Sequence, residues 1–181
     1  MSPAVHHKHP RYPGYDYTWS GAYFLTICVE QRRCDLGAVN DGVMVRSSLG
    51  ELVQAAWLQS FELRRELLLD CYVIMPNHLH AVVVIVREEQ AGEPTNPESH
   101  GRATLRKPHG LSSFVAGFKA ASTRRINEYN LTPGRRFWQP GFYDHIIRSE
   151  ADLHRIRQYI WENPHQWHHD SENPDLRPAS S

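Results

Sequence analysis

The chain alternates between apolar, β-branched runs and segments with helical spacing. Residues 22–30 (AYFLTICVE) and 67–75 are rich in aromatic and β-branched residues, which is typical of strands. A third run at 78–86 follows after a Pro-Asn pair that breaks the pattern, so it is expected to be the antiparallel neighbour of the second. Residues 142–147 indicate a fourth, shorter strand.

Three other segments have the spacing of amphipathic helices. The first is expected to begin at Ser48 with a Ser-x-x-Glu capping box and to end near Phe61. The second, of about five turns, is marked by apolar residues from Leu111 to Tyr129 and is closed by Leu-Thr-Pro-Gly at 131–134. The third follows Ser149, a good N-cap, and ends at Pro164. Because the strands are apolar on both sides, we expect a sheet that helices cover on at least one face.

The length of 181 residues indicates one domain, which we place at 20–167. An aromatic and basic segment, 1–19, precedes it, and a polar tail that we expect to be loosely ordered, 168–181, follows it. Within the domain, 87–108 is rich in Gly and Pro with hardly any large apolar residue and is expected to be a flexible insertion. Asn-Asp-Gly at 40–42 predicts a short hairpin.

Charge is balanced overall, with twenty basic and twenty acidic residues, but it is unevenly distributed. Residues 101–136 contain eight basic groups against Glu128 alone, whereas 20–100 contain eleven acidic and six basic groups. Such a basic stretch suits an anionic partner, although a solvated helix face has the same composition.

Cysteine use and hydropathy bear on the compartment. The three cysteines have no Cys-x-x-Cys spacing, so neither a disulfide framework nor a structural zinc site is indicated, and a reducing cytoplasm fits. No apolar run reaches the roughly 18 residues of a membrane span, and the first residues lack the apolar core of a signal peptide. We therefore expect a cytoplasmic protein without a membrane partner.

The third predicted strand contains the first candidate for chemistry, a His-x-His pair. Side chains two apart in a strand project from the same face, so the imidazoles of His78 and His80 converge on one point and could bind a metal ion. The chain has twelve histidines, so such pairs also arise by chance, and we interpret the pair at 7 and 9 as accidental. The pair alone does not decide between the two interpretations.

The third predicted helix adds a second group of candidates. Tyr159 and Asn163 are four residues apart and therefore share a face of that helix. A phenol oxygen is a nucleophile and an amide oxygen is a hard metal ligand, although a tyrosine at this spacing is also typical of a core edge. If the helix packs beside the histidines, a divalent ion held there could activate a phosphodiester while Tyr159 attacks phosphorus.

Four motifs together resemble the REP-associated tyrosine transposases, which belong to the His-hydrophobic-His single-tyrosine superfamily. The match covers roughly residues 11–167, and the motifs are DYTWSGAYFLTI (16–27), MPNHLHAVV (75–83), FWQPGFYDHIIR (137–148) and YIWENPHQW (159–167). The resemblance implies an α+β fold, a ferredoxin-like α/β sandwich with a central antiparallel sheet and helices mainly on one face.

The same resemblance implies an activity and a set of residue roles. It implies Mg²⁺- or Mn²⁺-dependent cleavage and rejoining of single-stranded DNA at repeat hairpins through a 5′-phosphotyrosine intermediate. His78 and His80 match the family's metal pair, Tyr159 its nucleophile and Asn163 the polar residue that completes the metal site. A monomer is favoured, although insertion-sequence relatives form dimers that exchange the tyrosine helix.

Candidate DNA contacts come from two regions that combine aromatic and basic residues, the second of which is the basic stretch above. By analogy with the family, they are Arg11, Tyr12, Tyr15, Tyr17, Lys119, Arg124, Arg125, Arg135 and Arg136. Two other functions remain open at this point. One is a metal-dependent phosphodiesterase in which water attacks, and the other is a non-catalytic module that binds hairpin nucleic acid.

Overall fold

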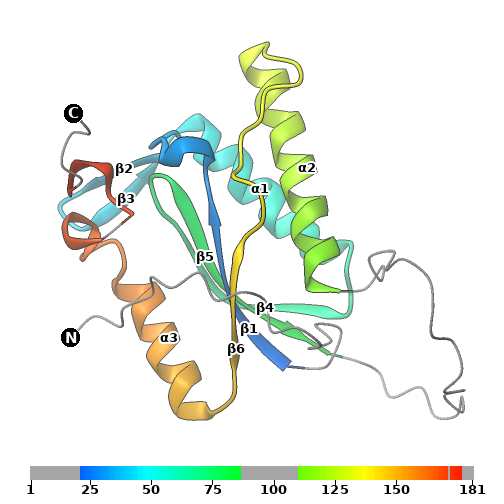
Figure 1. The fold of residues 1–181 in the computed structure, drawn as a ribbon, viewed down its shortest axis with the longest axis vertical. Helices are drawn as coiled ribbons and strands as arrows, with labels where there is room; N and C mark the ends of the chain where they lie inside the picture. Colours follow the sequence, from blue (N-terminus) through cyan, green and yellow to red (C-terminus); the bar gives the residue numbers. More distant parts are fainter. Residues whose placement is uncertain (1–20, 87–109, 171, 177–181) are drawn as a thin grey trace, which may run out of the picture.

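A four-stranded antiparallel sheet is the centre of the fold (Figure 1), which a computed structural model describes for residues 21–86, 110–170 and 172–176. The strand order is β4-β5-β1-β6. The elements are β1 (Gly21–Cys28), β2 (Gly37–Asn40), β3 (Val43–Arg46), α1 (Ser48–Glu62), β4 (Leu67–Ile74), β5 (His78–Ile85), α2 (Leu111–Asn130), β6 (Tyr143–Ile147) and α3 (Glu150–Glu162).

The connectivity of the sheet elements confirms the predicted fold class. Leaving aside the β2–β3 hairpin, the chain runs β1-α1-β4-β5-α2-β6, which is the ferredoxin-like β-α-β-β-α-β pattern. The hairpin turns at Asp41 and Gly42, whose φ angles of 51° and 76° are those of a primed turn. The predicted hairpin is therefore confirmed.

Side-chain alternation divides the sheet into two faces with different roles. On β1, Leu25 and Ile27 point to the face that α1 and α2 cover, and both are fully buried. Phe24 points to the other face, where it packs with Val82 of β5. Because strand residues alternate, the histidines of β5 lie on the same face as Val82.

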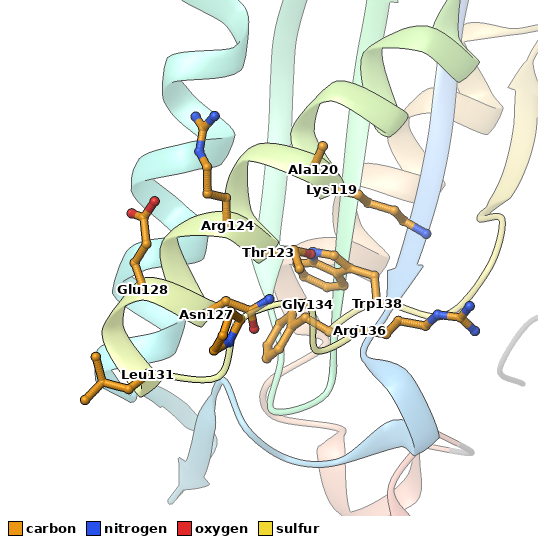
Figure 2. A pocket seen from close by; sticks show the side chains of 12 residues that line it. Lys119, Ala120, Thr123, Arg124, Asn127, Glu128, Leu131, Gly134, Arg136 and Trp138 are labelled. Atoms are coloured by element: carbon orange, nitrogen blue, oxygen red, sulfur yellow. The ribbon is translucent and has the colours of Figure 1, made fainter.

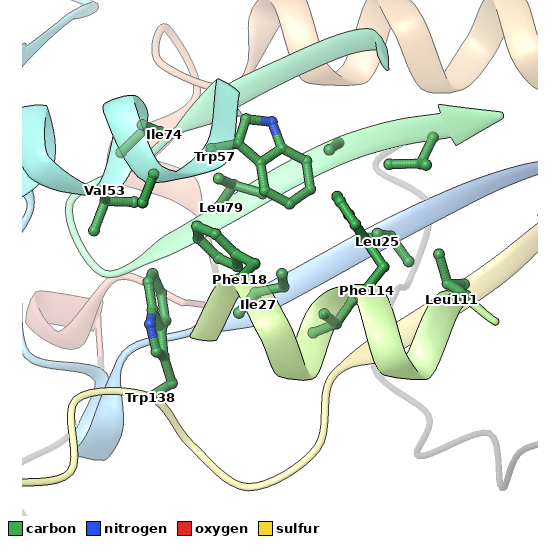
Figure 3. Packing of buried hydrophobic residues seen from close by; sticks show 14 of the residues in the cluster. Leu25, Ile27, Val53, Trp57, Ile74, Leu79, Leu111, Phe114, Phe118 and Trp138 are labelled. Carbon is green, nitrogen blue, oxygen red and sulfur yellow. The ribbon is translucent and has the colours of Figure 1, made fainter. Parts of the chain in front are cut away.

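The larger core lies between the sheet and the pair α1 and α2 (Figure 3). Its centre is Trp57 of α1, whose ring contacts those of Phe114 and Phe118 of α2 at centroid distances of 5.4 and 5.0 Å. Trp138 adds a fourth ring and donates a hydrogen bond of 2.9 Å from Nε1 to the Ser122 hydroxyl. This core covers one face of the sheet, and the smaller cluster that contains Phe24 and Val82 lies on the other face.

Helix α1 begins one residue differently from the sequence expectation. The N-cap is Ser47, whose hydroxyl oxygen accepts a 3.2 Å hydrogen bond from the Gly50 amide, so Ser48 is the first helical residue instead of the cap. The predicted capping box at Ser48 is wrong. Gly50 lies directly against the Leu36 carbonyl, where a β-carbon would be 2.2 Å from the oxygen, so position 50 tolerates no side chain.

Helix α3 lies on the opposite face of the sheet from α1 and α2 (Figure 1). Ile156 and Ile160 form its buried stripe and pack against Phe24 and Val82. Two helices thus share one face, as expected, and the third occupies the other. Within the described residues no helix is both long enough and apolar enough to cross a membrane. The predicted insertion at 87–108 lies outside the described residues.

Candidate active site

Strand β5 and helix α3 bring the four candidate residues into one region. The rings of His78 and His80 are 4.4 Å apart between centroids, and the hydroxyl of Tyr159 lies 3.3 Å from Nε2 of His80. The histidines and Asn163 are buried, with at most 3% of their surface exposed. The local reasons are the strand period, which puts both imidazoles on the α3 face, and the four-residue spacing on α3.

Hydrogen bonds around Asn77 determine which nitrogen of His78 carries the proton. The Asn77 amide nitrogen donates to the backbone carbonyls of Arg32 and Glu172, at 3.2 and 2.7 Å. Its oxygen therefore faces His78, where it lies 2.8 Å from Nδ1. Because that oxygen can only accept, Nδ1 must carry the hydrogen, which leaves Nε2 of His78 with a free lone pair.

The second histidine, His80, contacts a side chain of the adjacent strand β1. Its Nδ1 lies 2.9 Å from the hydroxyl of Thr26, its cross-strand partner on β1. Burial lowers the pKa of His80 to about 3, although a hydrogen bond to the Leu25 backbone opposes the shift. Burial, followed by the charges of His80 and Arg32, holds the pKa of His78 well below its usual value. Both rings are therefore neutral at physiological pH, the form that binds metal ions.

Tyr159 is protonated in this arrangement. Burial raises the pKa of its phenol above the ordinary value of 10, and the charge of Asp170 raises it further, while hydrogen bonding to Asn163 acts in the opposite direction. The hydroxyl can therefore donate to the Nε2 lone pair of His80. The phenol ring packs edge-on against Phe24, with centroids 6.1 Å apart, which fixes its direction.

Two acceptor atoms of the site are buried without a hydrogen-bond partner, Nε2 of His78 and Oδ1 of Asn163. An unpaired buried acceptor costs roughly 1–3 kcal/mol, so such atoms in a native protein usually meet a ligand or water. Both have lone pairs to give, which suits a cation. Among the described residues no group of three His, Cys, Asp or Glu side chains could hold a metal, so a cation here would depend on the amide as its third ligand.

The segment after α3 packs over the site, contrary to the expected loose tail. Two short 3₁₀ helices, Trp167–His169 and Pro174–Leu176, follow the helix. The Trp167 ring lies 6.1 Å from that of His78, and Glu172 is buried and paired with Arg32. The prediction is wrong for the described part of the tail because polar residues there serve the histidine site as hydrogen-bond partners.

Two of the basic residues proposed from sequence as DNA contacts have hydrogen-bond partners within the protein. The ammonium of Lys119 is bound to the backbone carbonyls of Gln139, at 2.7 Å, and Gly141, and burial lowers its pKa to about 8. The guanidinium of Arg125 donates to the side chain of Gln59. The candidates Arg11, Tyr12, Tyr15 and Tyr17 lie outside the described residues.

Exposed arginines remain on the outer side of α2. Arg124, Arg135 and Arg136 are exposed, and Arg124 and Arg136 project from different sides of a groove of about 760 Å³ (Figure 2). The groove lies between the second half of α2 and residues 133–138, and its floor includes Phe137 and Trp138. The groove is on the side of the sheet that α1 and α2 cover, whereas the histidines lie on the α3 side.

The resemblance to the single-tyrosine transposases implies a ferredoxin-like sheet whose His-x-His pair lies beside a helix-borne tyrosine, and His80 and Tyr159 are in contact in this way. Comparison with known proteins agrees. The chain is 34% identical over 174 residues to an uncharacterised protein of Haemophilus influenzae, covering 92% of this chain and 93% of that one. It is 22% identical over 153 residues to the REP-associated tyrosine transposase of Escherichia coli K12, covering 83% and 72%.

A solved structure supports the same assignment at the level of the fold. The structure of a REP-associated tyrosine transposase bound to a REP hairpin superposes with a TM-score of 0.58 at 18% identity, covering 91% of this chain and 86% of that one. No family model matches the sequence. The chain is thus similar in sequence to one REP-associated tyrosine transposase and similar in fold to another.

Proposed function

We propose that the protein cleaves and rejoins single-stranded DNA at repeat hairpins, with Tyr159 as the nucleophile that becomes linked to the 5′ phosphate. The observation that carries this proposal is the 3.3 Å contact between the Tyr159 hydroxyl and Nε2 of His80, on the face of the sheet that also holds His78. A phenol that only completed a core edge would not need to meet a buried pair of neutral imidazoles.

A divalent cation, Mg²⁺ or Mn²⁺, completes the proposed site. Its ligands would be Nε2 of His78, Oδ1 of Asn163 and Nε2 of His80, whose lone pair would exchange the Tyr159 hydroxyl for the cation. The two unpartnered acceptors support this assignment, and imidazole with an amide oxygen is a donor set that such ions accept. When bound, the cation supplies Lewis-acid polarisation of the scissile phosphate.

The residues of the chain perform the remaining steps. Phe24 and the sheet hold the phenol of Tyr159 toward the phosphate, and its oxygen forms a bond to phosphorus while the bond to the 3′ oxygen breaks. The phenolic proton passes to water, and the departing 3′ oxygen gains a proton. In the reverse direction a 3′ hydroxyl attacks phosphorus and releases Tyr159. Because the phosphodiester bond energy is kept, rejoining requires no other energy source.

The proposed partner is DNA that contains a palindromic repeat folded as a hairpin. A related transposase has been solved with a REP hairpin, and this chain shares its fold. The exposed Arg124, Arg135 and Arg136 are the remaining described candidates for phosphate contacts. One chain supplies both histidines, the phenol and the amide, which favours a monomer as the active species.

The test is a covalent adduct. The wild-type protein, incubated with labelled hairpin DNA and Mn²⁺, should form a protein–DNA adduct that survives denaturation. Tyr129→Phe is the matched control and should form the same adduct, because Tyr129 is exposed on α2. Tyr159→Phe keeps the ring that packs on Phe24 but removes the nucleophile, so no adduct should form. An adduct that persists in Tyr159→Phe refutes the assignment.

Other outcomes would identify the two alternative functions. Metal-dependent turnover without any adduct would point to a phosphodiesterase that uses water. Hairpin binding that a chelator leaves unchanged, with no cleavage under Mg²⁺ or Mn²⁺, would point to a non-catalytic binding module.

A further inference from the structure

The side-chain amide of Asn163 can serve the proposed cation in only one of its two orientations. An amide presents an oxygen with lone pairs on one side and an NH₂ donor on the other, and only the oxygen binds a cation. Asn163 lies at the end of α3 and is 3% exposed. Solvent therefore does not decide its orientation, and a protein group must do so.

Asp170 meets the NH₂ side of this amide, and the Tyr159 phenol is a second group that hydrogen-bonds the amide. The amide nitrogen of Asn163 donates to Oδ2 of Asp170 at 3.4 Å. A carboxylate can only accept, so this contact excludes the orientation in which the oxygen of Asn163 faces Asp170. The consequence is seen on the other side of the amide, where Oδ1 is buried and has no hydrogen-bond partner.

The Asp170 carboxylate is itself held in place by the 3₁₀ segment that contains it. Its second oxygen, Oδ1, accepts a hydrogen bond of 2.8 Å from the backbone amide of Glu172. The backbone amide of Asp170 donates to the carbonyl of Trp167 at 3.0 Å. Both carboxylate oxygens are therefore used, one by the backbone and one by Asn163, and the carboxylate cannot rotate without losing one of them.

We infer that Asp170 is a positioning residue of the metal site, which holds the Asn163 amide with its oxygen toward the cation. The inference rests on the proposed function, because it presumes that Asn163 is a ligand. Asp170 touches neither the cation nor the DNA in this account and acts only through Asn163. The described part of the C-terminal segment then contributes to the site through Asp170, which contacts the proposed ligand Asn163.

The first measurement is Mn²⁺ affinity of the full chain without DNA, followed by the loss of the free-ion electron paramagnetic resonance signal. Asp170→Ala should weaken binding about 10- to 100-fold, the usual effect of removing a group that orients a ligand. Asp175→Ala is the matched control, since Asp175 is exposed in the same segment, and should bind as the wild type does. Unchanged affinity in Asp170→Ala overturns the inference.

A double-mutant cycle separates positioning from a merely structural role. If Asp170 acts through Asn163, then Asp170→Ala should cause no further loss of affinity in an Asn163→Ala background. Losses that multiply instead would overturn the inference. If thermal melting shows that Asp170→Ala is unfolded, Asp170→Asn replaces it. A neutral amide there satisfies either orientation of Asn163, so affinity should fall by about twofold or more, and an unchanged value overturns the inference.

The same experiment distinguishes failure of the inference from failure of the proposed function. Wild-type protein that binds no Mn²⁺, or Asn163→Ala that binds it as tightly as the wild type, would refute the proposed ligand set. Wild-type binding that is weakened by Asn163→Ala but not by Asp170→Ala would leave the proposed ligands intact and refute only the role of Asp170.

Discussion

Acid should destabilise the metal-free protein because two buried imidazoles must stay neutral in the folded state. His78 and His80 are at most 3% exposed, and burial lowers the pKa of His80 to about 3 and that of His78 well below its usual value. In the unfolded chain both titrate near 6.5. Between these limits the unfolded state binds more protons, so stability is complete above about pH 6.5 and is lost as the pH falls toward the folded pKa.

The size of the effect follows from the shift. Each histidine with a folded pKa near 3 and an unfolded pKa near 6.5 costs about 2 kcal/mol of unfolding free energy between pH 7 and pH 5. Burial shifts the pKa of His78 in the same direction, so its loss adds to that of His80, against the roughly 5–15 kcal/mol by which domains are stable.

Urea denaturation in the presence of a chelator at pH 7, 6 and 5 measures this loss. The midpoint should fall steeply with pH in the wild-type protein and about half as steeply in His80→Gln. His169→Gln is the control, because His169 is exposed and should leave the slope unchanged. A wild-type midpoint that stays constant from pH 7 to pH 5 would show that the folded protein tolerates charged imidazoles, and the argument for neutral metal ligands would fail.

Two further predictions concern the DNA contacts and the support of the histidine pair. Replacing Arg124 and Arg136 together by Ala should weaken hairpin binding and reduce the slope of log affinity against log salt by about 1.4, for two lost contacts to a single strand. Arg65→Ala is the control and should leave the slope unchanged, because Arg65 is exposed but lies outside the groove. An unchanged slope in the double variant would show that the groove binds no DNA. Asn77→Ala should weaken Mn²⁺ binding about 10-fold or more, because the tautomer of His78 is then unfixed. Calorimetric titration that gives the wild-type constant would contradict this.

The parts of the site that could be predicted from sequence are those fixed by a local period. The two-residue period of a strand places His78 and His80 on one face, and the helical period places Tyr159 and Asn163 together on α3. The sequence did not predict that α3 covers the face with the histidines, and the hypothesis assumed it. It follows from the larger core, which occupies the opposite face with α1 and α2 and leaves one face for the last helix.

The remaining features had no local signal. The carbonyl of Glu172 meets Asn77 across 95 positions, and the 3₁₀ turns that bring it there have no hydrophobic period to reveal them. Lys119 was assigned to DNA by its charge, yet it binds the carbonyls of a turn that only the fold brings near α2. The prediction of the α1 N-cap was wrong for a simpler reason: Ser47 and Ser48 are adjacent and chemically alike, so the sequence does not distinguish them.

The proposed nucleophile and the proposed amide ligand lie on the same helix. Tyr159 and Asn163 are a single turn apart on α3, and Ile156 and Ile160 fix the rotation of that helix against the sheet. An inserted residue would turn both groups by about 100° and withdraw them from the histidines at once. If the proposed roles hold, a movement of α3 as a whole displaces the attacking oxygen and the amide oxygen together, whereas a substitution at a solvent-facing position of the helix displaces neither.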